Sequence, residues 1–205
     1  RFSAPGSMTA LFPLLIFVDS TVMSLLLVGV TIIFENQENS FKSIMVSPIS
    51  KDEYLVSKSL AVVTSSVITL ALLLAYGLLV ADLEINIPAI FGAVILVAFT
   101  FAQVGTIMTY CSKDFTDLLM GVFKFTIVFT LPTLLEGFQV LKGDWVKTVQ
   151  YFNPTKSALV LLAAATEPVD AKDLAISLIY LLALSGGLYA LSRRLLERYV
   201  AKGGA

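Results

Sequence analysis

Long apolar runs are the feature that most limits what this chain can fold into. Five runs are visible, and each has about 20 or more residues, enough at 1.5 Å per residue to cross a hydrocarbon core of about 30 Å. Because backbone groups inside a bilayer must hydrogen-bond to one another, the runs are predicted to be helices. We therefore predict an all-α polytopic transmembrane helix bundle, forming a single transmembrane domain over residues 1–205. The five runs lie at about 8–34, 56–81, 88–110, 118–138 and 174–196.

Composition supports a membrane protein and excludes several other classes. Hydrophobic residues make up 57% of the chain and charged residues 14%, whereas soluble domains have about 25% charged residues. The net charge of −1 gives no electrostatic basis for binding nucleic acid. The chain has no histidine and one cysteine, Cys111, which excludes a Ser-His or Cys-His catalytic pair, an ordinary zinc cluster and an internal disulfide. We therefore expect no metal site and no catalytic site on this chain, although carboxylate or lysine chemistry stays open and an enzyme is disfavoured rather than excluded.

The distribution of basic residues predicts the orientation in the membrane. They gather after the first run, after the third run and at the C-terminus, so these parts are expected to face the cytoplasm of a cell whose plasma (inner) membrane holds the protein. The link at 139–173 then lies outside. Five spans with a cytoplasmic C-terminus put Arg1 outside, so we expect a sixth span to precede the given sequence. The basic residues concerned are Lys42, Lys51, Lys58, Lys113, Lys124, Arg193, Arg194, Arg198 and Lys202.

The outer link at 139–173 contains a signal for a further helix. Asn153-Pro154 is predicted to break the chain and to start a helix, because proline is favoured in the first helical turn. The apolar stretch 157–165 that follows is too short to span a bilayer. We interpret it as a short re-entrant or interfacial helix.

Between the first two runs lies a polar segment, residues 35–55, which we call the elbow. Phe41, Ile44 and Met45 are spaced i, i+3, i+4, which places them on one face of a short helix. An amphipathic helix of this kind could lie on the membrane surface, or it could bind a partner protein. The pattern alone leaves both interpretations open.

The ends of the helix in the elbow are also predicted from local signals. Ser40 could cap its start, and Ser47-Pro48 should end it, because a residue before proline avoids the helical region. Ser50 and Glu53 then have the spacing of a capping box, which predicts the start of the next helix.

Polar residues within the predicted spans are candidates for a translocation path. Asp19 is the one acid well inside a span, and a charge there should face protein or water. It could contact cargo or a cation, or it could form a packing hydrogen bond. Hydroxyl and amide side chains in spans more often hold helices together than line a path, and we interpret Gly186-Gly187 as a packing or flexibility site. Glu136, near the outer boundary, is expected to be solvated. The pathway candidates are Asp19, Ser20, Ser24, Gln103, Thr126, Thr130 and Thr133.

The elbow resembles that of the permease subunit of an ABC-2 type (type V exporter) transporter. Such permeases carry an acidic segment, a stretch ending in Ser-Pro-Ile or Ser-Pro-Leu, a Tyr-Leu pair, and a lysine that opens the next span. A second shared feature is an Asn-Pro before a short apolar outer helix. The chain departs in having Asn39-Ser40 where many relatives have Gly-Thr, and five spans rather than six. The matching residues are Glu35, Glu38, Ser47-Pro48-Ile49, Tyr54-Leu55, Lys58 and Phe152-Asn153-Pro154.

The resemblance implies a coupling helix at about 38–46 that sits in a groove on a separate ABC ATPase subunit. The chain has no Gly-x-x-x-x-Gly-Lys-Ser/Thr phosphate loop, so ATP and Mg are expected on that partner and no cofactor on this chain. One bundle is half a pathway, so a homodimer or a paired permease is expected. The coupling residues would be Glu38, Ser40, Phe41, Ile44, Met45, Ser47 and Pro48.

The spans offer a mostly apolar lining with hydroxyl groups and few charges, which favours hydrophobic or amphipathic cargo. An alternative function is a secondary transporter or channel driven by an ion gradient, with Asp19 as the coupling acid. A third is a membrane enzyme acting on lipid through Asp19 or Glu136, although no paired carboxylates or metal-ligand spacing support it.

Overall fold

The computed structural model describes residues 5–38, 40–80, 85–137, 150, 152–166 and 169–201 as helices joined by short connections. Much of the link at 139–173 lies outside these residues. Within them, five helical stretches are long and apolar enough to cross a bilayer, which confirms the predicted all-α transmembrane bundle. The stretches are Leu11–Gln37, Lys51–Leu79, Ile87–Cys111, Phe115–Glu136 and Ala171–Val200.

Two of the spans contain a turn of π-helix. The first span consists of α1 (Pro5–Val18), the π-helix η1 (Asp19–Met23) and α2 (Ser24–Gln37). The fourth consists of α6 (Phe115–Phe125), η2 (Thr126–Thr130) and α7 (Leu131–Gly137). Single π-turns inside α-helices are uncommon and are frequent at functional sites. Asp19, the acid singled out above, begins η1.

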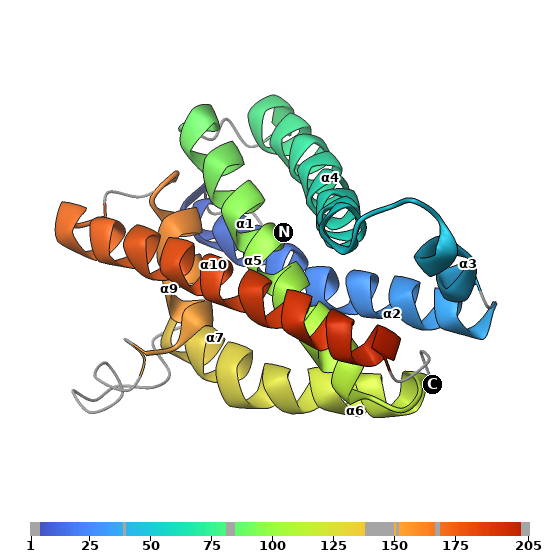
Figure 1. Cartoon of the computed structure of the whole chain (residues 1–205). Coiled ribbons are helices and arrows are strands. Elements are labelled where there is room, and N and C mark those ends of the chain that lie inside the picture. The colour runs from blue at the N-terminus through green and yellow to red at the C-terminus, as the bar shows by residue number, and fades with distance from the viewer. Residues whose placement is uncertain are drawn as a thin grey trace.

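The core of the bundle is built around α5 (Ile87–Cys111), which packs against α2, α4 (Lys51–Val80) and α10 (Ala171–Ala201). Figure 1 shows α5 running through the middle of the molecule, with α4 and α2 on one side of it and α10 crossing in front of it. Its buried residues are mostly apolar or small, so neighbouring helices can approach closely. They include Ile90, Val94, Val97, Ala98, Phe101, Ala102 and Gly105.

Glycines mark the closest helix contacts. A Cβ atom on Gly105 would lie 2.6 Å from the backbone oxygen of Leu25, and one on Gly29 would lie 2.6 Å from Leu118 Cδ2. These positions join α5 to α2 and α2 to α6. A Cβ atom on Gly186 or Gly187 would meet nothing within 4 Å. The packing role predicted for that pair is therefore not found in the described part of this chain.

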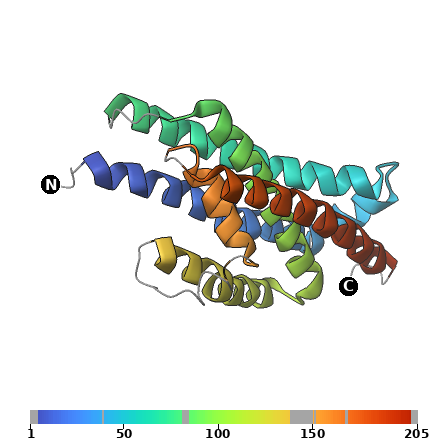
Figure 2. The same ribbon diagram turned by 90° about the vertical axis from the view of Figure 1, so that its left-hand side faces the viewer.

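The short helices lie at opposite ends of the bundle. Figure 2 shows α3 (Ser40–Val46) beside the end of α10, while α7, α9 (Pro154–Ala163) and the start of α10 lie toward the other end. We call these the α3 end and the α9 end. As predicted, α9 is too short to span; it packs against α1, α5 and α10. The Asn86 N–H donates to the Ala165 carbonyl at 2.9 Å, which joins the chain just after α9 to the start of α5.

Candidate functional site

The short helix of the elbow is fixed by local hydrogen bonds at its end. The helix α3 begins at Ser40, and the backbone N–H and hydroxyl of Ser47 both donate to the Ile44 carbonyl, at 3.2 and 2.6 Å. The predicted capping box is confirmed: the Ser50 N–H donates to Glu53 Oε2 at 2.7 Å, and the Glu53 N–H donates to Ser50 Oγ at 3.2 Å. Two sharp boundaries therefore separate α3 from α4.

One face of α3 is held in a cluster of aromatic rings. Phe41 is 2% exposed, and its ring meets those of Tyr54 and Tyr199 edge-on at centroid distances of 5.7 and 5.6 Å. The Tyr110 ring lies 5.2 Å from that of Tyr199. We call these four residues the aromatic cluster. They belong to α3, α4, α5 and α10, so Phe41, expected among the coupling residues, faces the bundle and fixes α3 to it.

Charged groups reinforce the attachment of the elbow. Glu35, at the end of α2, forms a mostly buried ion pair with Lys58 and accepts a hydrogen bond from the Tyr54 hydroxyl at 2.9 Å. The acidic residue, the tyrosine and the lysine of the elbow motif thus meet in space. Asn36 Nδ2 donates to the Tyr199 hydroxyl at 3.1 Å, which adds a link from α2 to α10.

A second polar contact joins α4 to α10. Asp52, in the first turn of α4, accepts from the Tyr189 hydroxyl at 3.1 Å and lies 3.3 Å from Arg193 Nε. Arg193, grouped above with the basic residues that set the orientation, is therefore also bound to α4. The start of α4 is held by α10 through both this contact and the aromatic cluster.

The outer face of the elbow exposes apolar side chains. Val46 is 87% exposed and Ile49 is 48% exposed, on either side of the exposed Pro48. Apolar groups in such positions are available to a partner. Of the expected coupling residues, Glu38 and Pro48 are exposed, and Phe41 is buried. Those that are partly buried are Ser40, Ile44 and Ser47. The side chain of Met45 is not among those that the structure describes.

Asp19 and its neighbours form a polar contact between the first span and α4. Asp19 is partly buried and lies near the hydroxyl groups of Ser66 and Thr69. Ser24 Oγ lies 3.3 Å from Ser66 Oγ. Ser20 is fully buried, and its hydroxyl has no partner among the described residues.

The remaining pathway candidates lie in α5 and the fourth span. Gln103 Nε2 donates to Ser59 Oγ at 2.7 Å, which joins α5 to α4. The Thr126 hydroxyl bonds to its own helix, at the Val122 carbonyl, while the hydroxyl of the buried Thr130 has no partner among the described residues. No hydrogen bond within the described residues joins all the candidates into one site. Their role in a path stays a prediction.

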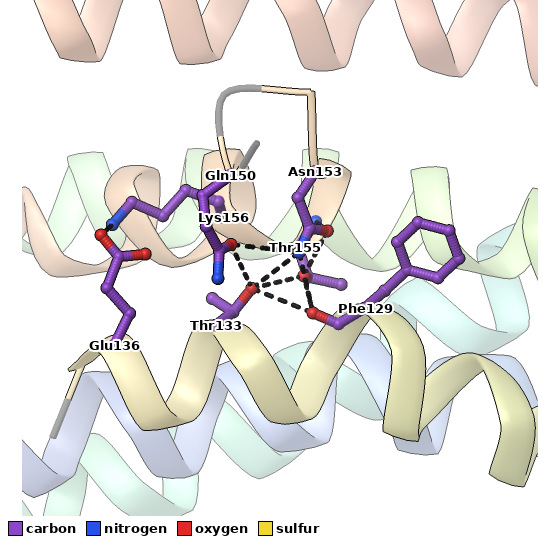
Figure 3. A network of polar contacts seen from close by, with 7 residues as sticks. All are labelled: Phe129, Thr133, Glu136, Gln150, Asn153, Thr155 and Lys156. Carbon is purple, nitrogen blue, oxygen red and sulfur yellow. Dashed lines mark hydrogen bonds and ion pairs between the residues drawn. The ribbon is translucent and has the colours of Figure 1, made fainter. Parts of the chain in front are cut away.

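At the α9 end, polar side chains converge on one backbone carbonyl. Phe129, within η2, accepts from Asn153 Nδ2 at 2.9 Å, Thr155 Oγ1 at 2.7 Å and Thr133 Oγ1 at 3.0 Å (Figure 3). Gln150 Oε1 lies 3.2 Å from both Thr133 Oγ1 and Asn153 Nδ2, within hydrogen-bonding distance of each. Thr133, a pathway candidate, therefore belongs to a network that fixes α9 to the fourth span.

The predicted helix start at Asn153-Pro154 is confirmed. Asn153 Oδ1 caps α9 by accepting from the Thr155 N–H at 3.1 Å, and Pro154 occupies the first turn. The same side chain thus begins α9 and binds the Phe129 carbonyl.

An ion pair lies beside this network. Lys156 Nζ lies 2.6 Å from Glu136 Oε1, and the Glu136 side chain is 17% exposed (Figure 3). The expectation of a solvated Glu136 is therefore wrong. No local pattern pointed to this pair, because the two residues lie on different helices, α7 and α9.

A bundle of long apolar helices with a short, firmly attached helix at one end defines a multi-pass membrane protein. Residues 3–194 match the family described as ABC-2 family transporter protein, so the chain belongs to this family. It is a membrane permease of the ABC transporter class and not an enzyme, which confirms the resemblance read from the elbow motif. ABC-2 permeases pair with an ABC ATPase.

Two curated relatives are the fluoroquinolones export permease proteins of Mycobacterium tuberculosis strains CDC 1551 / Oshkosh and ATCC 25618 / H37Rv. Each is 25% identical to this chain over 193 residues, which cover 93% of this chain and 78% of the relative. No solved structure matches the chain.

Proposed function

We propose that this permease exports hydrophobic or amphipathic compounds, driven by a separate ATPase subunit that binds the outer face of the elbow. The observation that carries the proposal is the two-sided character of α3. Its inner face is fixed to two spans, α4 and α10, through Phe41, whereas Val46 and, just after the helix, Ile49 expose apolar surface. Apolar side chains of this kind are suited to a groove on a partner.

The attachment of α3 indicates how a conformational change of the ATPase would be transmitted to the membrane spans. ATP and Mg would be bound by the partner, and closure of the ATPase would displace α3. Because Phe41 packs against Tyr54 of α4 and Tyr199 of α10, these helices would move with it. The Glu35–Lys58 ion pair would hold α2 and α4 together during the movement.

The cargo class and the assembly are also part of the proposal. Two relatives are named for fluoroquinolone export, and we propose drug-like amphipathic compounds of this kind as cargo. Two copies, or this chain with a paired permease, would enclose the path in the plasma (inner) membrane. The α3 end and the C-terminus would face the cytoplasm.

The test is capture of the cognate ATPase subunit by the purified permease. Val46→Glu and Ile49→Glu should each weaken binding about tenfold, the change expected when a contact worth about 1.4 kcal/mol is lost. Cys111→Glu is the matched control, because it adds the same charge at an exposed residue that ends α5 at the α3 end. Unchanged binding of the two elbow variants would refute docking at this face.

Phe41→Glu provides a second arm of the same experiment. It should weaken ATPase binding by displacing α3, and it should also lower the melting temperature because Phe41 is buried. Val46→Glu should leave the melting temperature unchanged. The two variants therefore separate loss of the docking face from loss of its support.

A second candidate function is transport driven by an ion gradient with Asp19 as the coupling acid. The observation favouring it is that Asp19 lies in a π-turn and faces two hydroxyl groups of α4. Transport that continues without ATP, stops with an uncoupler and is lost in Asp19→Asn would support it. Transport that requires ATP and survives Asp19→Asn would refute it.

A further inference from the structure

A cavity opens at the α9 end, apart from the elbow. Its volume is about 330 Å³, within the range of small-molecule sites. It lies between α7, α9 and α10, beside the network around the Phe129 carbonyl. The residues that line it are Glu136, Lys156, Ser157, Val160, Asp173, Ile176 and Ser177.

The charged groups of the lining are unbalanced. Glu136 and Asp173 supply two carboxylates, and Lys156 is the one cation in the lining as described. Lys156 binds Glu136 Oε1, but Glu136 Oε2 is buried and has no partner among the described residues. One lysine leaves one of the two lining carboxylates without a counter-charge among the described residues, so a ligand that brings an N–H donor and a positive charge would be favoured.

The other lining groups show what the rest of the ligand should be. Val160 and Ile176 give the cavity an apolar wall, and the hydroxyl-bearing Ser157 and Ser177 are both nearly buried. A hard metal ion would need a shell of several oxygen ligands, and the described residues contain no group of three acidic, histidine or cysteine side chains that could hold one. An apolar wall beside an excess of carboxylate instead suits an organic cation.

The position of the cavity suits the same ligand. Glu136 ends one span and Asp173 lies in the first turn of α10, so both carboxylates are expected at the level of the lipid headgroups. Amphipathic molecules concentrate at this level, with the apolar part toward the acyl chains and the charge toward water.

We propose that this cavity binds amphipathic organic ammonium compounds, with the ammonium group between Glu136 and Asp173 and the apolar body against Val160 and Ile176. Only one part of this proposal rests on the proposed function, namely that the bound compound is cargo held at the side of the membrane from which it leaves. The binding itself needs neither ATP nor the ATPase subunit.

The test compares two probes that share an apolar body and differ in charge, 1-naphthylmethylammonium and 1-naphthylacetate. Binding is measured by isothermal titration calorimetry on the whole chain in phosphatidylcholine nanodiscs, with empty nanodiscs as the blank. The cation should bind at least about tenfold more tightly than the anion, since a hydrogen bond to a charged group accounts for a change of this size.

Variants at the start of α10 identify the site. Asp173→Asn should weaken binding of the cation about tenfold, and Asp173→Lys should reverse the preference toward the anion. Asp170→Asn is the matched control, because Asp170 precedes the same helix, is exposed and is not part of the lining. It should leave both affinities unchanged.

Equal affinities of the two probes, or an equal loss in Asp170→Asn and Asp173→Asn, would overturn the inference. That result would leave the proposed function standing, because ATPase capture is measured separately. Failure of ATPase capture with selective binding of the cation would refute the proposed coupling and retain the cavity as a cation site.

Discussion

Replacing Gly105 with alanine should strain the contact between α5 and α2. The new Cβ atom would lie 2.6 Å from the Leu25 backbone oxygen and 2.6 Å from Val28 Cγ1. This is about 0.8 Å short of the 3.4 Å at which ordinary contact begins. The Leu25 oxygen belongs to a helix backbone and cannot rotate away, so the helices must separate. Overpacking of this kind costs about 1–3 kcal/mol.

Gly187→Ala is the matched control for this substitution. Both glycines lie inside long helices, so both variants gain the same helix propensity of about 1 kcal/mol. A Cβ atom on Gly187 meets nothing within 4 Å. The difference between the two variants therefore isolates the steric term, and Gly105→Ala should melt about 2–12 °C below Gly187→Ala for a chain of this size.

The assay is thermal unfolding of both variants in the same detergent. The measured quantity is the fraction of protein that remains monodisperse on size-exclusion chromatography after heating to each temperature. Gly105→Val should melt lower still, because it adds two methyl groups at the same contact. If Gly105→Ala melts at or above Gly187→Ala, α2 and α5 do not approach as closely as described, and the packing argument fails.

Three further predictions concern the elbow and the α9 end. Glu35→Gln should lower the free energy of unfolding by about 1.5–3 kcal/mol, because it weakens charge-assisted hydrogen bonds from Lys58 and Tyr54. Lys58→Met should then lower the free energy of unfolding less in the Glu35→Gln background than in the unmodified chain. Equal losses in thermal melts of this double-mutant cycle would contradict the pairing. Asn153→Ala should lower the free energy of unfolding by about 2–3 kcal/mol, because it removes both the α9 cap and the hydrogen bond to the Phe129 carbonyl. Asn86→Ala removes only the cap of α5 and should lower it by about 1 kcal/mol. Equal melting temperatures of the two variants would argue against the second role of Asn153. Ser50→Ala should destabilise the start of α4 by about 1 kcal/mol, because it removes the capping box, and should therefore speed trypsin cleavage after Lys51. Ser57→Ala is the control, and equal cleavage rates in the two variants would count against the capping box.

The features predicted correctly from the sequence are those decided by neighbouring residues. Run length and apolar content predict the five spans, because a bilayer leaves the backbone no choice but to hydrogen-bond within each segment. The capping box at Ser50 and Glu53 and the helix start at Asn153-Pro154 depend on residues at most three positions apart.

The features that were missed depend on residues distant in the sequence. Helical spacing puts Phe41 and Ile44 on one face of α3, but it does not say what covers that face. The cover includes Tyr199, which is supplied by the last helix. The ion pair of Glu136 with Lys156 likewise requires knowing that α9 folds back against α7.

The two π-turns were missed for a related reason. Runs of apolar residues fit an α-helix and a π-turn equally well, so the choice depends on tertiary partners. At η2 these partners are Asn153 and Thr155, which donate to the Phe129 carbonyl. The threonine spacing in the fourth span gives no indication of them.

The last helix, α10, is continuous and contacts both the elbow and the cavity at the α9 end. Leu196 and Tyr199 lie against the elbow, and Asp173 and Ser177 line the cavity at the other extreme of the same 31-residue helix. At 1.5 Å per residue it is about 45 Å long. It packs against α4, α5 and α9, so a displacement at one of its ends would be shared with these helices. In the proposed coupling, α10 would therefore transmit a displacement at the α3 end to the cavity at the α9 end, and a ligand bound in that cavity would act on the α3 end through the same helix.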